Sequence, residues 1–282
     1  MTSNNNPLLS IGMPVYNSIG TIEKSIESLI KQTFTSFELI ISDNCSSDGT
    51  YELLQKIAST DLRIKLIRQP HNIGASRNFE FLLFKSTGKY FMWAAADDFW
   101  LSGFAQENLD FLETNQDYVS SISKVRYMDN KTYPERKMGT FALTGTYRNN
   151  LIDYMMKPAS NSRFYSIHRS KNIKESWVND EYWAMDWTII CNLLKFGKFN
   201  ETCNVQMLRG PGGASKNAFT TISRSNALSK FDKIFPLAKF STLLLKEPEA
   251  RGSLKILSML LIYNVVYALK MIGGWIRFLL SK

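Results

Sequence analysis

Two apolar runs of the chain end in carboxylates that could take part in metal-assisted chemistry. Asp43 closes the run Phe37–Ser42, and Asp97 and Asp98 close the run Tyr90–Ala96. Adjacent carboxylates after an apolar strand are costly unless a cation compensates them. Because Mg²⁺ binds carboxylate oxygens together with substrate phosphates, Asp97 and Asp98 could hold a metal-bound diphosphate. They could equally be a helix N-cap and a first-turn acid, since a helical pattern starts soon after them.

Asp43 and Arg77 also have two interpretations each when they are taken singly. The Asp43 carboxylate could accept hydrogen bonds from a nucleobase or ribose, or it could form an Asx turn leading into Ser46-Ser47-Asp48-Gly49. Arg77 is either an exposed cation or a contact to a base and a phosphate. The surrounding elements must decide where these side chains lie.

A parallel α/β sheet is expected to position these residues. Apolar runs alternate with patterns of helical spacing, which is typical of β-α-β units. In open α/β sheets, ligands bind beyond the carboxyl ends of the strands, where these carboxylates fall. The expected strands are Leu8–Val15, Phe37–Ser42, Ile64–Ile67 and Tyr90–Ala96, and the expected helices are Thr21–Gln32, one that follows Thr50, Asn78–Lys85 and Ser102–Asn115.

The segment from residue 118 to residue 215 is less regular. It combines short alternating runs with one clear helical pattern and a final glycine-rich stretch. His168 and Arg169 follow a predicted strand and either line an acceptor cleft or have a structural role. The expected strands are Tyr118–Met128, Phe164–His168 and Thr202–Arg209, the expected helices are Ile152–Lys157 and Glu181–Phe196, and loops are expected over Asp129–Gly145 and Arg209–Ser215.

The ordered set of motifs resembles the family 2 glycosyltransferases, which are inverting GT-A-fold enzymes that use nucleotide-sugars. The similarity is strong over about Leu8–Trp100 and traceable to about Ser215. It implies a single Rossmann-like, mostly parallel sheet flanked by helices, with residues 1–100 as the nucleotide-binding half and 101–215 as the acceptor-binding half. The motifs are Pro14-Val15-Tyr16-Asn17, Asp43-Asn44-Cys45-Ser46-Ser47-Asp48-Gly49-Thr50, Asn72-Ile73-Gly74-Ala75-Ser76-Arg77-Asn78, Gly88-Lys89-Tyr90 and Asp97-Asp98.

This resemblance implies a donor site and a metal site in the first half. Pro14-Val15-Tyr16-Asn17 and Asp43 match the positions that hold the nucleotide, with Asp43 as the partner of a uracil or thymine imide and Arg77 as a second base contact. Asp97 and Asp98 match the end of the acidic metal motif, one near the ribose and one on Mg²⁺ or Mn²⁺. Many members read Asp-x-Asp-Asp, but Ala95 stands at the first position here.

The resemblance also implies a catalytic base and a donor-covering arginine in the second half. Asp186, within Trp183-Ala184-Met185-Asp186-Trp187, matches an acidic motif and is expected to accept the proton of the acceptor hydroxyl. A simple first-turn helix acid is the alternative, with Asp180 and Glu181 as rival bases. Arg209 is expected to cover the donor phosphates beneath a closing loop, unless residues 210–215 form only a Gly-Pro turn.

Charge and cysteine usage indicate the compartment. The 282-residue chain carries +9, and residues 216–282 hold eleven Lys and Arg against three Asp and Glu, a net +8. A basic tail with aliphatic neighbours favours an anionic membrane surface over nucleic acid. Cys45, Cys191 and Cys203 have no metal-ligand spacing and, after a polar start, fit reduced thiols in the cytosol.

Leu254–Leu280 is expected to be an apolar helix whose three cations share one stripe. At about 100° per residue, Lys255, Arg277 and Lys270 project within about 60° of one another. This pattern is typical of a helix that lies in the membrane interface. Packing on the protein's own core and a membrane span are the alternatives, and Gly273-Gly274 should weaken one continuous helix.

The expected function is an inverting transfer of sugar from a nucleotide-sugar, with a preference for UDP-sugars, assisted by Mg²⁺ or Mn²⁺. The expected acceptor is a glycan or a lipid-linked glycan in surface-polysaccharide or lipopolysaccharide assembly. Residues 1–215 would form the enzyme domain and 216–282 a membrane-associating region, at the cytoplasmic face of the plasma membrane. The alternatives are a weakly active nucleotide-sugar-binding scaffold, which Ala95 makes plausible, and a nucleotidyltransferase, although Pro14–Gly20 lacks a basic glycine-rich loop.

Overall fold

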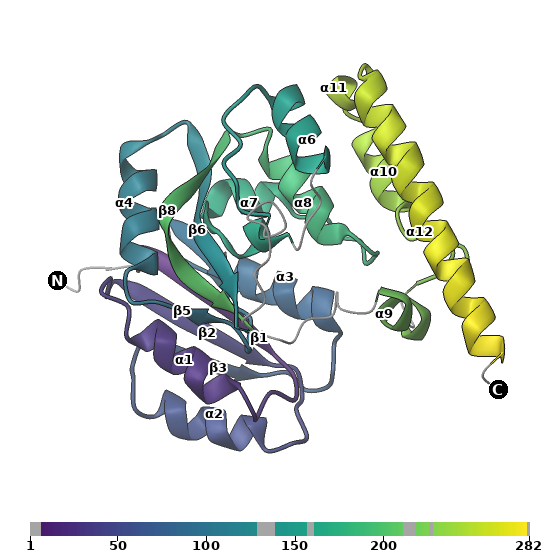
Figure 1. Cartoon of the computed structure of the whole chain (residues 1–282). Coiled ribbons are helices and arrows are strands. Elements are labelled where there is room, and N and C mark those ends of the chain that lie inside the picture. The colour runs from purple at the N-terminus through teal and green to yellow at the C-terminus, as the bar shows by residue number, and fades with distance from the viewer. Residues whose placement is uncertain (1–6, 129–138, 157–160, 211–217, 226–227, 281–282) are drawn as a thin grey trace.

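The apolar runs of the first half form the parallel part of an eight-stranded sheet in the computed structural model (Figure 1). The structure describes residues 7–128, 139–156, 161–210, 218–225 and 228–280. The four predicted strands and four helices are confirmed, with bounds that differ by a few residues. They are β1 (Leu9–Val15), α1 (Ile22–Ile30), β2 (Phe37–Asp43), α2 (Thr50–Ala58), β3 (Ile64–Arg68), α3 (Ala75–Lys85), β4 (Tyr90–Trp93) and α4 (Phe104–Thr114).

The second half completes the sheet on the far side of β4. The strand order is β3-β2-β1-β4-β7-β6-β8-β5. The pairs among β1 to β4 and the pair β6 with β8 are parallel, whereas β7 and β5 run antiparallel to their neighbours. The added elements are β5 (Phe99–Trp100), β6 (Tyr118–Tyr127), α6 (Tyr147–Met156), the 3₁₀ turn η1 (Ser162–Tyr165), β7 (Ile167–Arg169), α7 (Ser170–Ser176), α8 (Met185–Leu193) and β8 (Lys198–Arg209).

The strand predicted over Phe164–His168 is wrong in its first part. Residues 162–165 form η1, and the strand β7 begins at Ile167. The reason is that Phe164 stacks on Trp93 of β4, with ring centroids 4.3 Å apart. Its apolar character therefore serves packing across the sheet. Loops predicted within 129–138 and 211–215 lie outside the described residues.

Both faces of the sheet carry a hydrophobic core. Successive side chains of a strand point to opposite faces. Thus Tyr90 and Met92 join the core under α1 and α4, while Phe91 and Trp93 join the core beneath α3, α6, α7 and α8. This two-sided burial explains why the central strands are apolar along their whole length. It also leaves the strand ends, where polar residues gather, as the open edge of the sheet.

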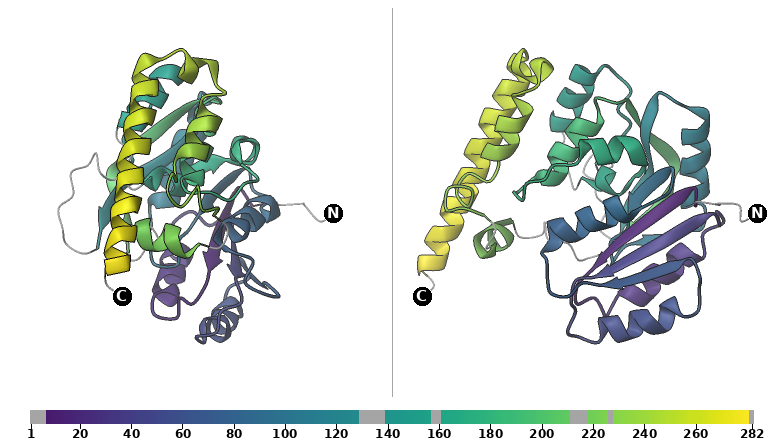
Figure 2. Two further views of the ribbon diagram at one scale, coloured as in Figure 1. Left: turned by 90° about the vertical axis from the view of Figure 1, so that its right-hand side faces the viewer. Right: turned by 180° about the vertical axis from the view of Figure 1, so that it is seen from behind.

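The C-terminal region forms a helical layer beside α6 and α8 of the second half. It contains α9 (Ala218–Arg224), α10 (Ala238–Leu244), α11 (Pro248–Arg251) and the 27-residue helix α12 (Leu254–Leu280). Figure 2 shows α12 running along the outside of the molecule. It packs on α6, α9 and α11, and the Tyr263 hydroxyl donates to the carbonyl oxygen of Met155. Within the described residues, α12 is the one helix long and apolar enough to cross a membrane.

α12 runs unbroken through Gly273-Gly274, contrary to the expectation from helix propensity. At Gly274 a Cβ atom would lie 2.2 Å from the Phe219 ring. The glycine thus lets α9 approach α12 closely. Tertiary packing here outweighs the intrinsic cost of glycine in a helix.

Candidate active site

The loop after β1 and the loop after β2 are joined by hydrogen bonds at the carboxyl edge of the sheet. Val15 and Asp43 are register partners at the ends of the two strands. Asn17 donates its backbone N–H to Ser46 Oγ at 2.9 Å, and its side-chain oxygen accepts from the Ser47 N–H at 2.9 Å. These bonds hold Asn17 at a φ of 48°, which asparagine tolerates. The predicted nucleotide-binding residues Pro14, Val15, Asn17 and Asp43 therefore come together, with Tyr16 half exposed beside them.

Asp43 presents a carboxylate oxygen that is buried and has no hydrogen-bond partner. The residue is fully buried, and its Oδ1 atom is the unpartnered one. The Oδ2 atom accepts from the Ser46 N–H at 3.2 Å and lies 3.7 Å from Arg68 Nε. A buried acceptor without a donor is costly. An N–H group of a bound base would remove that cost.

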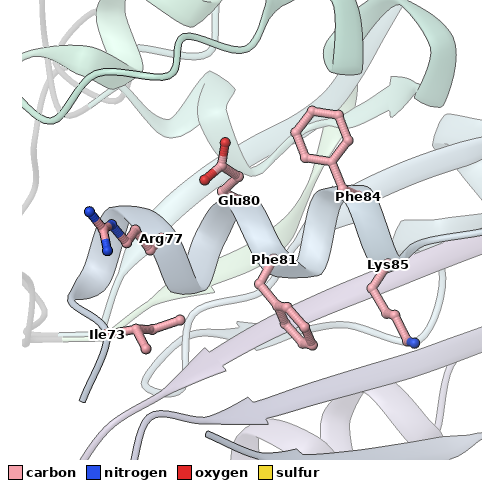
Figure 3. Close-up of a pocket in the computed structure, with 6 residues that line it drawn as sticks. All are labelled: Ile73, Arg77, Glu80, Phe81, Phe84 and Lys85. Carbon is pink, nitrogen blue, oxygen red and sulfur yellow. The ribbon is translucent and has the colours of Figure 1, made fainter. Parts of the chain in front are cut away.

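Arg77 lies on α3, the helix that follows β3. It is exposed on the first turn of α3, where Asn78 anchors the helix by donating to the carbonyl oxygen of Ser42 at 3.0 Å. Figure 3 shows Arg77 near the start of α3, in an open groove of about 500 Å³. In the described part of the chain, no hydrogen bond or ion pair joins Arg77 to Asp43. The groove is lined by Ile73, Arg77, Glu80, Phe81, Phe84 and Lys85.

Asp98 is the buried member of the acidic pair formed by Asp97 and Asp98. Its Oδ1 atom accepts from the Gly210 N–H at 2.9 Å, and its Oδ2 atom lies 3.6 Å from Arg209 Nε. Burial raises the pKa of Asp98 to about 6, although Arg209 and the Gly210 N–H oppose the rise. At Gly210 a Cβ atom would lie 2.0 Å from the Asp97 carbonyl oxygen. Only glycine permits the end of β8 to close on Asp97 and Asp98 this tightly.

Asp97 and Asp98 fit a minimal divalent-metal site of the kind that substrate phosphates complete. Asp98 Oδ2 is buried without a hydrogen-bond partner, and Asp97 is half-buried beside it. No cluster of three or more His, Cys, Asp or Glu that could hold a metal occurs in the described ranges. Mg²⁺ and Mn²⁺ sites often use one or two carboxylates, with phosphates and water supplying the other ligands. The Ala95 carbonyl oxygen accepts hydrogen bonds from Ser25 Oγ at 3.1 Å and from the Asp98 N–H at 3.3 Å.

Arg209 links the acidic group to the turn η1. Its Nη1 atom donates to Ser162 Oγ at 3.3 Å, and its guanidinium lies over the Tyr165 ring at 5.0 Å. The side chain is only 14% exposed. Arg209 also interacts electrostatically with Asp186, so one cation acts on both acidic positions. It is thus placed to neutralise charge that develops there.

Asp186 lies in the first turn of α8, as the motif predicts. Ala184, the residue just before α8, has a φ of 68°. The helix begins directly after this left-handed residue. Asp186 is half-buried, and its Oδ2 atom accepts from Asn161 Nδ2 at 2.7 Å. Burial raises the pKa of Asp186, while the Asn161 bond acts against the rise. A raised pKa suits a general base, because it increases the affinity of the carboxylate for the proton that it must accept.

The other candidates of the second half have structural contacts. His168 is fully buried between Ser120 Oγ, at 2.9 Å, and the Phe164 carbonyl oxygen, at 3.2 Å, and burial lowers its pKa to about 4. Arg169 donates to backbone carbonyl oxygens of Tyr118 and Leu112. These contacts support the structural role for both residues. The rival base Asp180 pairs with Lys239 at 3.0 Å, and Glu181 is exposed.

Two residues near the site have no motif signal. Arg68, the last residue of β3, adjoins Asp43 and stacks over the Tyr51 ring at 4.3 Å. Its position just before the predicted stop of the third apolar run is a signal that could have marked it. Asn161 lies in a stretch without periodicity, so only the folded structure brings it to Asp186.

Solved glycosyltransferases have the same fold. The mannosyltransferase PcManGT of Pyrobaculum calidifontis, in complex with GDP-Man and Mn²⁺, matches with a TM-score of 0.63 at 13% identity, over 98% of this chain and 76% of that one. Residues 1–349 of S. aureus TarS, in complex with UDP-GlcNAc, match with a TM-score of 0.60 at 17% identity, over 89% and 79%. The chain therefore has the GT-A fold of these glycosyltransferases.

The chain belongs to glycosyl transferase family 2, whose model matches residues 10–176. TuaG of Bacillus subtilis, named for teichuronic acid biosynthesis, is 33% identical over 106 residues, which cover 38% of this chain and 42% of TuaG. The chain thus matches less than half the length of this relative. The Escherichia coli enzyme WfaP, named as a UDP-Glc:α-D-GlcNAc-diphosphoundecaprenol β-1,3-glucosyltransferase, is 27% identical over 79% of this chain and 86% of its own.

Proposed function

We propose that the protein transfers a sugar from a UDP-sugar, with inversion, to a lipid-linked glycan of surface-polysaccharide assembly. The observation that carries the proposal is that one buried cation, Arg209, interacts with both the acidic pair and Asp186. Donor and acceptor chemistry would then meet at one edge of the sheet. The test is release of UDP or GDP from a panel of nucleotide-sugars with Mn²⁺, with and without lipid-linked acceptors.

In this mechanism Asp186 accepts the proton of the acceptor hydroxyl. The hydroxyl oxygen attacks the anomeric carbon from the side opposite the diphosphate, and the bond from that carbon to the diphosphate oxygen breaks, with its electrons leaving on the diphosphate. Arg209 balances the charge of the departing group, in a buried site where such charge interactions are strong. Because the site holds both reactants in this geometry, the entropic part of the activation barrier is lower.

On the donor side, Asp43 Oδ1 would accept the imide N–H of uracil, and Pro14-Val15-Tyr16-Asn17 would line the pocket. Asp97 and Asp98 would hold Mg²⁺ or Mn²⁺. When bound, the ion would act as a Lewis acid toward the diphosphate. Residues 1–100 then act as the nucleotide-binding half and 101–215 as the acceptor half.

The Asp43 assignment predicts weaker UDP binding in Asp43→Ala, by about tenfold to a hundredfold, because a hydrogen bond to a charged group is lost. Cys45, half-buried two residues away, reports on the pocket. In a Cys203→Ser background, which removes the exposed thiol, UDP should protect Cys45 from alkylation. The Asp43→Ala variant should lose this protection at the same UDP concentration.

The control is Asp61→Ala, because Asp61 pairs with Arg63 at the opposite edge of the sheet. This variant should keep full protection by UDP. CDP, whose base lacks an imide N–H, should protect less than UDP in the parent protein. Equal protection by UDP in Asp43→Ala and the parent would contradict the assignment.

The acceptor assignment is supported by the position of α12. Trp187, next to the proposed base, contacts the Tyr263 ring edge-on with centroids 6.4 Å apart, and Tyr267 of the same helix interacts electrostatically with Asp186. WfaP is named for an undecaprenyl diphosphate acceptor. A base beside a membrane-lying helix would meet an acceptor anchored in that membrane.

The outer face of α12 fits a lipid surface. Its exposed apolar side chains recur at helical spacing on one side, and Ile256, Leu260 and Met271 lie buried on the other. Lys255, Lys270 and Arg277 are exposed along the edge of the apolar face, where they complement anionic head groups. The face is formed by Leu261, Val265, Leu269, Ile272 and Ile276. We therefore place the enzyme on the cytoplasmic face of the membrane, with residues 216–282 as its docking region.

This docking face predicts vesicle binding that depends on composition. The full chain should co-sediment with vesicles containing anionic lipid, and Leu261→Ser with Leu269→Ser should weaken binding at least tenfold, because each buried leucine contributes about 2 kcal/mol. Lys255→Gln with Lys270→Gln should weaken binding to anionic vesicles only. The control, Leu62→Ser, changes a fully exposed leucine before β3 and should bind normally. Unchanged binding by the double serine variant would contradict docking, and resistance to alkaline extraction from membranes would indicate a span instead.

A further inference from the structure

Asn161 connects the proposed base to a buried tyrosine. Its Nδ2 group donates to Asp186 Oδ2 at 2.7 Å, and the Tyr154 hydroxyl donates to Asn161 Oδ1 at 3.0 Å. Asn161 is 4% exposed and Tyr154 is 2% exposed. The amide is therefore enclosed between the carboxylate and the core of the second half.

The two partners determine which way the Asn161 amide faces. An ionised carboxylate can only accept, so the NH₂ group must face Asp186, and the amide oxygen must then face Tyr154. Burial raises the pKa of Tyr154 well above its usual range, so its hydroxyl keeps the proton that it donates. A flipped amide would place two acceptors against each other at Asp186. The Tyr154 hydroxyl thus fixes the orientation of the Asn161 amide, and that amide fixes the orientation of the Asp186 carboxylate.

The backbone holds Asn161 in place from both sides. Its φ is 46°, in the left-handed region that asparagine adopts more readily than most residues, and its carbonyl oxygen accepts the Phe164 N–H at 3.0 Å to close η1. The next residue, Ser162, accepts a hydrogen bond from Arg209. One short turn therefore carries both the partner of the base and a partner of the cation beside Asp98.

From this geometry we propose that Asn161 is a positioning residue for Asp186. It holds Oδ2 of the carboxylate, which leaves Oδ1 to take the proton of the acceptor hydroxyl, and its hydrogen bond favours the ionised form of the carboxyl group, against the effect of burial. This inference rests on the proposed function, in which Asp186 is the base. It adds a residue that touches neither donor nor acceptor.

Few other groups could perform this task. Arg209 is engaged by Asp98 and Ser162. The tyrosines and the thiol around Asp186 all have raised pKa values and are neutral at neutral pH, so they cannot supply a compensating positive charge. The groups that interact electrostatically with Asp186 are Arg209 of β8, Tyr154 of α6, Tyr165 of η1, Tyr182 before α8, Cys191 of α8 and Tyr267 of α12.

The test is Asn161→Gly in the full-length protein, which keeps the left-handed backbone accessible and removes the amide. With the nucleotide-sugar that turns over fastest, kcat at neutral pH should fall about tenfold. The acid limb of the kcat profile should move up by about one pH unit, because loss of a donor to the charged form raises the pKa of the base. The affinity for UDP should stay within about twofold, since Asn161 does not contact the donor loops.

Two further variants separate positioning from folding. Asn161→Asp keeps the backbone preference and the size but sets a carboxyl group against Asp186, so the acid limb should move up further. Tyr154→Phe keeps the amide and frees it to flip, so a smaller shift in the same direction is expected. A wild-type acid limb in Asn161→Gly would overturn the inference.

Failure of the inference and failure of the proposed function give different results. If Asp186→Asn is inactive while Asn161→Gly has a wild-type acid limb, Asp186 stands as the base and the positioning role is lost. If Asp186→Asn retains wild-type turnover, the base itself is misassigned, and the role of Asn161 falls with it. A common loss of activity and a common shift in Asn161→Gly and Asn161→Asp support the inference.

Discussion

Asp186→Asn should lower turnover of the nucleotide-sugar by about 10²- to 10⁴-fold at neutral pH while leaving UDP binding unchanged. The asparagine keeps the shape of the side chain and its place in the first turn of α8, but it cannot accept the acceptor's proton. Binding is expected to be preserved because Asp43 and Asp98 lie on other elements. Rates from UDP release and affinity from calorimetry with UDP and Mn²⁺ measure the two effects separately.

Asp180→Asn is the matched control for this change. Asp180 lies six positions earlier, is exposed and pairs with Lys239, so its loss should change turnover less than twofold. Normal turnover in Asp186→Asn combined with a loss in Asp180→Asn would transfer the base role to Asp180. Tight UDP binding without turnover in the parent protein, even with lipid-linked acceptors, would favour the scaffold alternative.

The sequence predicts the first half of the fold well because its signals are local. The strands β1, β2 and β4 are buried on both faces, so each appears as an apolar run, and each crossover helix has one apolar face. Gly88, before β4, is a residue that packing requires, since a Cβ there would lie 2.7 Å from the Ser10 N atom. At such positions, the residue that packing requires is also the residue that the sequence pattern places before a strand.

The second half is predicted less well because its pairings are non-local. β6 and β8 form a long parallel pair with register irregularities, although β6 ends at Tyr127 and β8 begins only at Lys198. β5 has only two residues and depends on β8 for its existence. Phe164 takes part in an aromatic stack with Trp93, and no rule of sequence spacing predicts that contact.

The residues of the candidate site also divide into those with a local sequence signal and those that depend on non-local contacts. Resemblance and strand-end position predict Asp43, Asp97, Asp98 and Asp186, because acidic residues at these places carry a recognisable motif. Asn161 has no such signal, since its partner is 25 residues away in the chain and its conformation is left-handed. Arg209 is predicted to cover phosphates, whereas the structure holds it against Asp98 and Ser162.

In this arrangement Arg209 can pair with either of two negatively charged groups, the Asp98 carboxylate or the diphosphate of a donor. With no donor bound, the guanidinium compensates the buried Asp98 carboxylate, which would otherwise be expensive. A diphosphate would compete for the same cation, and Asp98 would then need another positive charge. A divalent ion between Asp98 and the diphosphate would supply that charge, which is why the proposed metal site and Arg209 belong to one electrostatic unit.

Asp98→Asn tests that unit and should lower turnover by about 10²-fold or more, because the variant keeps the acceptor for the Gly210 N–H but loses the negative charge. The Mn²⁺ concentration for half-maximal turnover should rise at least tenfold, as one of two carboxylate ligands becomes a weak one. Asp110→Asn, which changes an exposed acid on α4, is the control and should behave as the parent. An unchanged Mn²⁺ dependence in Asp98→Asn would contradict the assignment of Asp98 as a ligand of the metal.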